Sequence, residues 1–207
     1  MKDFYSVVLY FNNILLLICC ILLIIRCKNF EKKEKWYIYY IIFLFLIEVI
    51  NKLLIYVFNI ENTVFLYPIY IAGEFLILTT LFIRKLNLPK YWFVFSLLLF
   101  LIFVVGRNFS MTSGVDDYAK VISNIIVICF AGSTLLQKIK SDKITNRFLL
   151  VDGLIFLYYS VSVFVFIIQH QLILLSEENY LLILTLNNIL SSLLYLSLIY
   201  TVLKLKK

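Results

Sequence analysis

Seven long apolar runs constrain the fold of this chain more than any other feature of its sequence. Each has roughly the 17–25 residues that an α-helix needs to cross the hydrocarbon core of a membrane. Of the 207 residues, 63% are hydrophobic, whereas soluble domains are about 45–50% apolar. The sequence therefore predicts an all-α polytopic membrane protein, a bundle of seven transmembrane helices that forms one domain from residue 1 to 207. The predicted helices cover residues 4–25, 36–58, 65–83, 90–106, 118–136, 148–168 and 180–203.

The first apolar run is interpreted as a transmembrane helix rather than a cleaved signal peptide. The chain starts MKDFYSVVLYFNN, which lacks a strongly basic segment, and the end of the run, ICCILLIIRCKN, lacks the small-residue pattern of a cleavage site. We therefore expect this run to be retained as the first helix.

The basic residues between the runs indicate how the helices are oriented. Lys and Arg concentrate in the cytoplasmic segments of membrane proteins, and with seven spans the connections alternate between the two sides. Most of the 19 Lys and Arg residues lie in alternate connections, at 26–35, 84–90 and 137–147, and at the end of the chain, 204–207. The pattern predicts an outside N-terminus and a cytoplasmic C-terminus, in what we expect to be the bacterial cytoplasmic (inner) membrane.

The net charge of +7 follows from the same distribution. Because the basic residues lie next to the membrane, we expect them to attract the anionic headgroups of membrane lipids. No nucleic acid is expected as a partner.

Cysteine and histidine give no sign of a disulfide framework or a cofactor. Cys19, Cys20 and Cys129 fall inside apolar runs, where paired cysteines are not indicated. With a single histidine and no Cys-x-x-Cys motif, the sequence predicts no cofactor and no metal site.

Polar residues inside the apolar runs are the most informative functional feature. The stretch FLIEVINKLL holds Glu48 and Lys52 at i,i+4 spacing, in the order that favours a helical ion pair. With a rise of ~1.5 Å per residue, Glu48 lies roughly 12 Å and Glu74 roughly 14 Å below the outer membrane face. Amides of the first, fifth and seventh runs fall in the same band, which predicts a shared binding site in the outer half of the bundle. The candidate binding residues are Asn12, Asn13, Glu48, Asn51, Lys52, Tyr70, Glu74, Asn124, Asn187, Asn188 and Ser191.

These polar residues also have a structural interpretation. A charged residue at the membrane centre costs ~2.5–3.5 kcal/mol, so Glu48 and Lys52 need partners and can provide them for each other. The amides can join helices through hydrogen bonds. Glu74 has no partner nearby in the sequence, which favours a functional role for it. Lys120 is a further charged residue inside an apolar run. Asp152, close to the cytoplasmic end of its helix, is interpreted as the partner of a cytoplasmic Lys or Arg.

The sequence carries none of the familiar catalytic motifs. It has no GxSxG, HExxH, P-loop or Rossmann glycine pattern. Rhodopsins and G-protein-coupled receptors share the predicted topology, but a retinal protein needs a lysine in the middle of its seventh helix, and residues 180–203 have none. Because the catalytic motifs are absent, an enzyme is the less favoured interpretation.

Two stretches, YPIYIAGEF at residues 67–75 and NNILSSLLYLSLIY at residues 187–200, carry a family resemblance. They resemble segments of small seven-helix integral membrane proteins of the Bacteroidetes type. The resemblance implies the seven-helix architecture and no particular activity.

Three functional classes remain open. The first is a transporter or solute-binding protein for a small solute or ion, with Glu74 as a proton- or cation-coupling carboxylate. The second is a membrane sensor that signals through a separate cytoplasmic protein partner, because the cytoplasmic connections are short. The third is an intramembrane lipid hydrolase that uses Glu48 and Glu74 as an acid–base pair. We favour the first class because charged residues inside membrane spans usually mark ion or substrate pathways.

Overall fold

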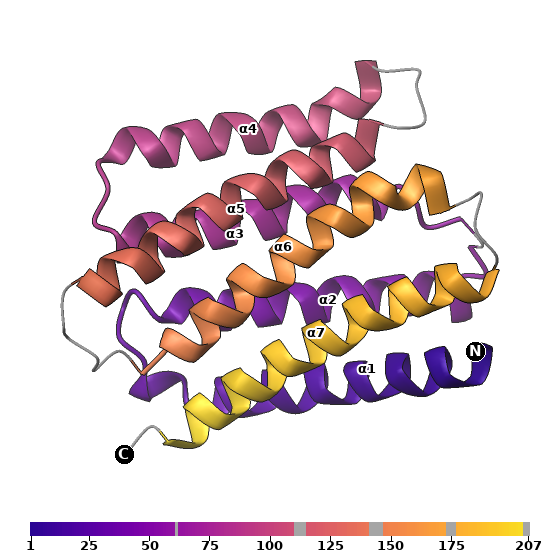
Figure 1. Cartoon of the computed structure of the whole chain (residues 1–207), viewed down its shortest axis with the longest axis horizontal. Coiled ribbons are helices and arrows are strands. Elements are labelled where there is room, and N and C mark those ends of the chain that lie inside the picture. Colours follow the sequence, from indigo (N-terminus) through magenta and orange to yellow (C-terminus); the bar gives the residue numbers. More distant parts are fainter. Residues whose placement is uncertain (61, 110–114, 141–146, 173–176, 205–207) are drawn as a thin grey trace. The chain divides into compact units, whose positions relative to one another are not determined.

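The computed structural model of the chain is all-helical (Figure 1). It describes residues 1–60, 62–109, 115–140, 147–172 and 177–204, with side chains described outside 106–117 and 168–177. The helices of this described part are α1 (Lys2–Ile25), η1 (Cys27–Asn29), α2 (Lys35–Tyr56), α3 (Leu66–Lys85), α4 (Lys90–Phe109), α5 (Val115–Lys140), α6 (Leu149–Leu172) and α7 (Glu177–Lys204).

Six of the described helices, all except α4, are long and apolar enough to cross a membrane. The apolar part of α4 whose side chains are described, Lys90–Val105, is shorter. The seven predicted helices are therefore confirmed as helices, and six of them as helices of membrane-spanning length and composition. Several extend past the apolar runs, as α7 does at both ends, because backbone hydrogen bonds within a helix continue through its polar end turns.

The chain divides into two compact units. The central unit comprises Phe30–Ser123, and the terminal unit comprises Met1–Asn29 together with Asn124–Lys207. The boundary falls inside α5, so the first turns of that helix belong to the central unit and the remainder to the terminal unit.

The central unit is built around α3, which packs against both α2 and α4. Gly73 permits a close approach to α2, because a Cβ atom at this position would collide with the ring of Phe43. On the α4 side, Phe75 and Phe103 meet edge to face with ring centroids 5.3 Å apart. This packing makes α3 the most buried of the six membrane-length helices.

The terminal unit is built around α7, which packs against α1 and α6 (Figure 1). Near the middle of α1, Asn12 Oδ1 lies 3.0 Å from the Ser191 hydroxyl and 2.9 Å from the Ser192 hydroxyl of α7. At the C-terminal ends of α1 and α7, Arg26 donates to the carbonyl oxygen of Val202 at 3.1 Å. Polar contacts thus fix α1 against α7 at two levels.

Candidate functional site

A buried ion pair between Glu74 of α3 and Lys120 of α5 is the most distinctive polar feature of the central unit. Lys120 Nζ donates to Glu74 Oε2, and the two side chains are only 2% and 3% exposed. Both residues lie in helices of membrane-spanning length. The pair therefore places two opposite charges away from water.

Tyr70 completes this cluster from the same face of α3 as Glu74. The two residues are at i,i+4 spacing, which makes them neighbours on a helix, and the Tyr70 hydroxyl donates to Glu74 Oε1 at 3.2 Å. Lys120 Nζ lies 3.3 Å from the same hydroxyl and 4.4 Å from the centroid of the Tyr70 ring. Lys120 therefore has both a carboxylate and an aromatic ring as partners, and a ring face attracts a cation most strongly where water is excluded.

The cluster is electrically neutral as a whole but contains two charges that depend on each other. Removing one partner of a buried ion pair typically costs 3–5 kcal/mol, because the other charge is left uncompensated. Any ion or solute group that separates Glu74 from Lys120 must therefore offer a replacement charge.

The sequence prediction included Tyr70 and Glu74 but gave no role to Lys120. Glu74 and Lys120 are 46 positions apart, so no local spacing rule connects them. Charge pairing across the apolar runs was the available signal: Lys52 already had Glu48 one turn away, which left Lys120 and Glu74 as complementary charges.

Glu48 and Lys52 form the i,i+4 ion pair that the sequence predicts on α2. Lys52 Nζ lies 3.3 Å from Glu48 Oε1, and the side chains are 43% and 35% exposed for Lys52 and Glu48. Asn51, next to Lys52, is half-buried. This pair is satisfied within one helix and is far more exposed than the pair of Glu74 and Lys120.

Three of the predicted residues of the terminal unit make hydrogen bonds between its helices: Asn12, Asn124 and Ser191. Asn12 contacts Ser191, as described above, and the buried Asn124 donates to Ser162 of α6 at 3.1 Å. Asn187 is half-buried, and its Oδ1 atom has no hydrogen-bond partner among the described residues. The half-buried side chains of this unit also include Asn13 and Asn188.

The structure thus groups several predicted residues: Tyr70 with Glu74, Glu48 with Lys52, and Asn12 with Ser191. That all the candidates line one cavity stays a prediction.

Asp152 has the basic partner that the sequence predicts for it. Its buried carboxylate accepts a hydrogen bond from Lys138 Nζ, which comes from the end of α5 in the same unit. The Lys138 side chain is 16% exposed. This pair is the closest counterpart, in the terminal unit, of the pair of Glu74 and Lys120.

Over the described ranges, no three His, Cys, Asp or Glu side chains come together as a group that could hold a metal ion. The sequence matches no protein-family model, and no curated protein or solved structure shows significant similarity to it.

Proposed function

We propose that this chain is a seven-helix transporter or solute-binding protein of a bacterial cytoplasmic membrane, with an outside N-terminus and a cytoplasmic C-terminus. Its ligand is a small charged solute or an ion, and its binding site includes Glu74, Lys120 and Tyr70. The orientation rests on the distribution of Lys and Arg along the sequence.

The burial of Glu74 together with Lys120 is the observation that supports this function. Each charge would cost ~2.5–3.5 kcal/mol at the centre of a membrane. Apolar side chains of similar volume often give equal or greater stability than a buried ion pair, so stability alone does not account for the two charges. Ionisable residues inside membrane spans usually belong to ion or substrate pathways.

The proposed mechanism is an exchange of partners at Glu74. A cation, a proton or the ammonium group of a solute binds the carboxylate and displaces Lys120. The Lys120 ammonium group then keeps the hydroxyl and ring of Tyr70 as partners, which lie 3.3 and 4.4 Å away. If the ligand also carries a carboxylate, Lys120 can bind it. The site is in its unbound form when Glu74 pairs with Lys120, and in its bound form when Glu74 pairs with the ligand.

Charge movement across reconstituted membranes tests this function. Proteoliposomes of the full-length protein are adsorbed to a solid-supported membrane and given a jump in Na⁺ concentration or in pH. We expect a transient current from the wild type, and its loss in Glu74→Gln/Lys120→Met, which removes both charges together and leaves neither uncompensated.

The matched control is Asp152→Asn/Lys138→Met, which removes the ion pair of the terminal unit and should keep the current. If the wild type gives no current after either jump, ion-coupled transport is rejected. If the Glu74 and Lys120 double variant gives the wild-type current, these residues are not the site.

A further inference from the structure

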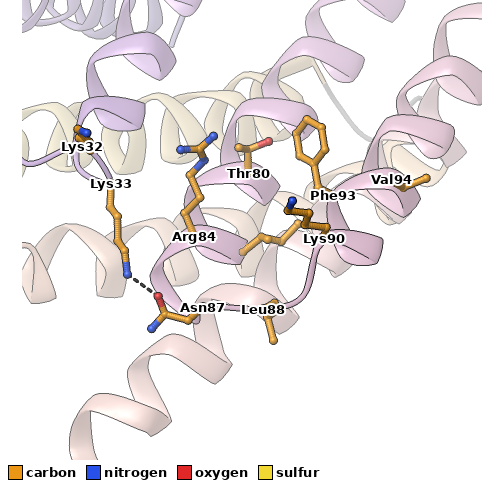
Figure 2. Close-up of a pocket in the computed structure, with 10 residues that line it drawn as sticks. Lys32, Lys33, Thr80, Arg84, Asn87, Leu88, Lys90, Phe93 and Val94 are labelled. Carbon is orange, nitrogen blue, oxygen red and sulfur yellow. Dashed lines mark hydrogen bonds between the residues drawn. The ribbon is translucent and has the colours of Figure 1, made fainter.

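A second site, separate from the buried ion pair, is indicated by a cavity at one end of the central unit. Its volume is about 770 Å³, within the usual range of ligand pockets. It is lined by residues from the segment before α2, the last turns of α3, the connection from α3 to α4, and the first turns of α4 (Figure 2). In the predicted orientation this end of the helices faces the cytoplasm.

Four cationic side chains line this cavity, and none of its described lining residues is acidic. They are Lys32, Lys33, Arg84 and Lys90. Lys33 Nζ donates to Asn87 Oδ1 at 2.5 Å, the bond drawn in Figure 2. The structure gives these four residues no ion pair with a carboxylate in the described part of the chain.

Neither of the two neighbouring acidic residues, Glu31 and Glu34, lines the cavity. Glu34 follows Lys33 in the sequence, but its side chain is buried and its carboxylate accepts the backbone N–H of Glu31 at 2.9 Å. Glu31 itself is exposed and does not line the cavity. In addition, α4 begins at Lys90, and the N-terminus of a helix carries a partial positive charge. The cavity therefore favours an anion.

The cavity also has an apolar wall. Basic residues that served only to orient the chain in the membrane would not need one. Phe93 and Val94 of α4 line it while remaining 40% and 52% exposed, and Leu88 lines it beside them. Figure 2 shows Phe93 and Val94 on the α4 side of the cavity, and Arg84 on α3. Basic and apolar groups within one cavity match a ligand that carries a phosphate and a hydrocarbon chain.

Thr80 supplies an observation independent of charge. It lines the cavity one turn before Arg84, is 1% exposed, and its hydroxyl oxygen has no hydrogen-bond partner in the described residues. The adjacent Thr79 does donate, to the carbonyl oxygen of Phe75 at 2.7 Å. Leaving a buried hydroxyl without a partner is destabilising, and an oxygen of a bound ligand would supply the missing partner.

We propose that this cavity binds the phosphate group of an anionic phospholipid. Arg84 and the lysines contact the phosphate oxygens, with the Arg84 guanidinium suited to bind two of them at once. The first carbons of an acyl chain lie along Phe93 and Val94. Soluble phosphate shares the headgroup chemistry, but it makes no use of the apolar wall.

Native mass spectrometry of the full-length protein, titrated separately with phosphatidylglycerol, phosphatidylcholine and inorganic phosphate, tests this site. We expect saturable binding of phosphatidylglycerol and about tenfold weaker binding in Arg84→Ala, because hydrogen bonds to charged groups are lost. The matched control is Lys35→Ala, which removes an equal charge from an exposed residue that does not line the cavity. It should leave the affinity unchanged.

Thr80→Val is a second variant that keeps every charge and nearly the same volume. It should bind phosphatidylglycerol more weakly than the wild type does, whereas a merely structural hydroxyl would alter only the melting temperature. Equal losses of affinity in Arg84→Ala and Lys35→Ala would reduce the effect to general surface charge and overturn the proposal. Saturable binding of inorganic phosphate, with no preference between the two lipids, would assign the cavity to soluble phosphate and overturn it as well.

Discussion

At the scale of single residues, the central unit has one ion pair within a helix and one between helices, and the two differ in how much they affect stability. Glu48 and Lys52 are one turn apart on α2 and more than a third exposed, and exposed pairs contribute only about 0–1 kcal/mol. Glu74 and Lys120 are almost completely buried and come from different helices. Only the second pair makes the stability of the protein depend on both charges being present.

This difference predicts a specific pattern of stability in four variants. Lys120→Met should lower the free energy of unfolding by about 3–5 kcal/mol, because the Glu74 carboxylate stays buried without its main partner. Glu74→Gln/Lys120→Met should recover most of that loss. The melting temperature of the purified protein in detergent measures both effects.

The control for this series is the exposed pair, with Lys52→Met and Glu48→Gln/Lys52→Met expected to stay within about 1 kcal/mol of the wild type. Similar losses in Lys120→Met and Lys52→Met would contradict the assignment of a buried, mutually dependent pair.

At the scale of helices, the approach of α2 to α3 depends on the absence of a side chain at one position. A Cβ atom on Gly73 would collide with the ring of Phe43, whereas a Cβ atom on Gly153 of α6 would meet nothing within 4 Å. The two glycines should therefore respond differently to substitution by alanine. An alanine at position 73 would require the ring of Phe43 to move, whereas an alanine at position 153 would displace nothing.

We therefore expect Gly73→Ala to destabilise the protein by about 1–3 kcal/mol through overpacking. Gly153→Ala should be neutral, or stabilising by up to about 1 kcal/mol, because alanine loses less backbone freedom in a helix. Thermal unfolding in detergent measures both.

Gly73→Ala/Phe43→Leu tests the cause of the loss, since a smaller side chain opposite the new methyl group should restore stability. An unchanged defect in this double variant would show that the ring of Phe43 is not the obstacle.

At the scale of the whole molecule, the positions of Lys and Arg lead to a prediction about membrane orientation. The basic connections before α2, between α3 and α4, and between α5 and α6 should face the cytoplasm together with the C-terminus. A fluorescent protein fused after Lys207 should therefore fluoresce in bacterial cells, and alkaline phosphatase fused there should be inactive. The opposite result for this pair of reporters would overturn the proposed orientation.

Much of the fold could be predicted because it depends on interactions that are local in the sequence. Each helix is held by hydrogen bonds between residues four apart, so the apolar runs placed all seven helices within a few residues of their observed ends. The same periodicity predicted the ion pair of Glu48 with Lys52 and the shared face of Tyr70 and Glu74. Asp152 was given a basic partner by its position, although the sequence did not single out Lys138.

Hydropathy and helix geometry are properties of a continuous segment, so the sequence alone was enough to identify the helical segments and to indicate that most of them suit a membrane. The pairing of Lys120 with Glu74 became visible only in the folded chain. The same is true of the cavity that Thr80, Arg84 and Lys90 line with Lys32 and Lys33. These residues come from different helices and connections. Their contacts depend on how each helix is rotated about its axis and how closely it packs, and several rotations satisfy the same apolar pattern equally well.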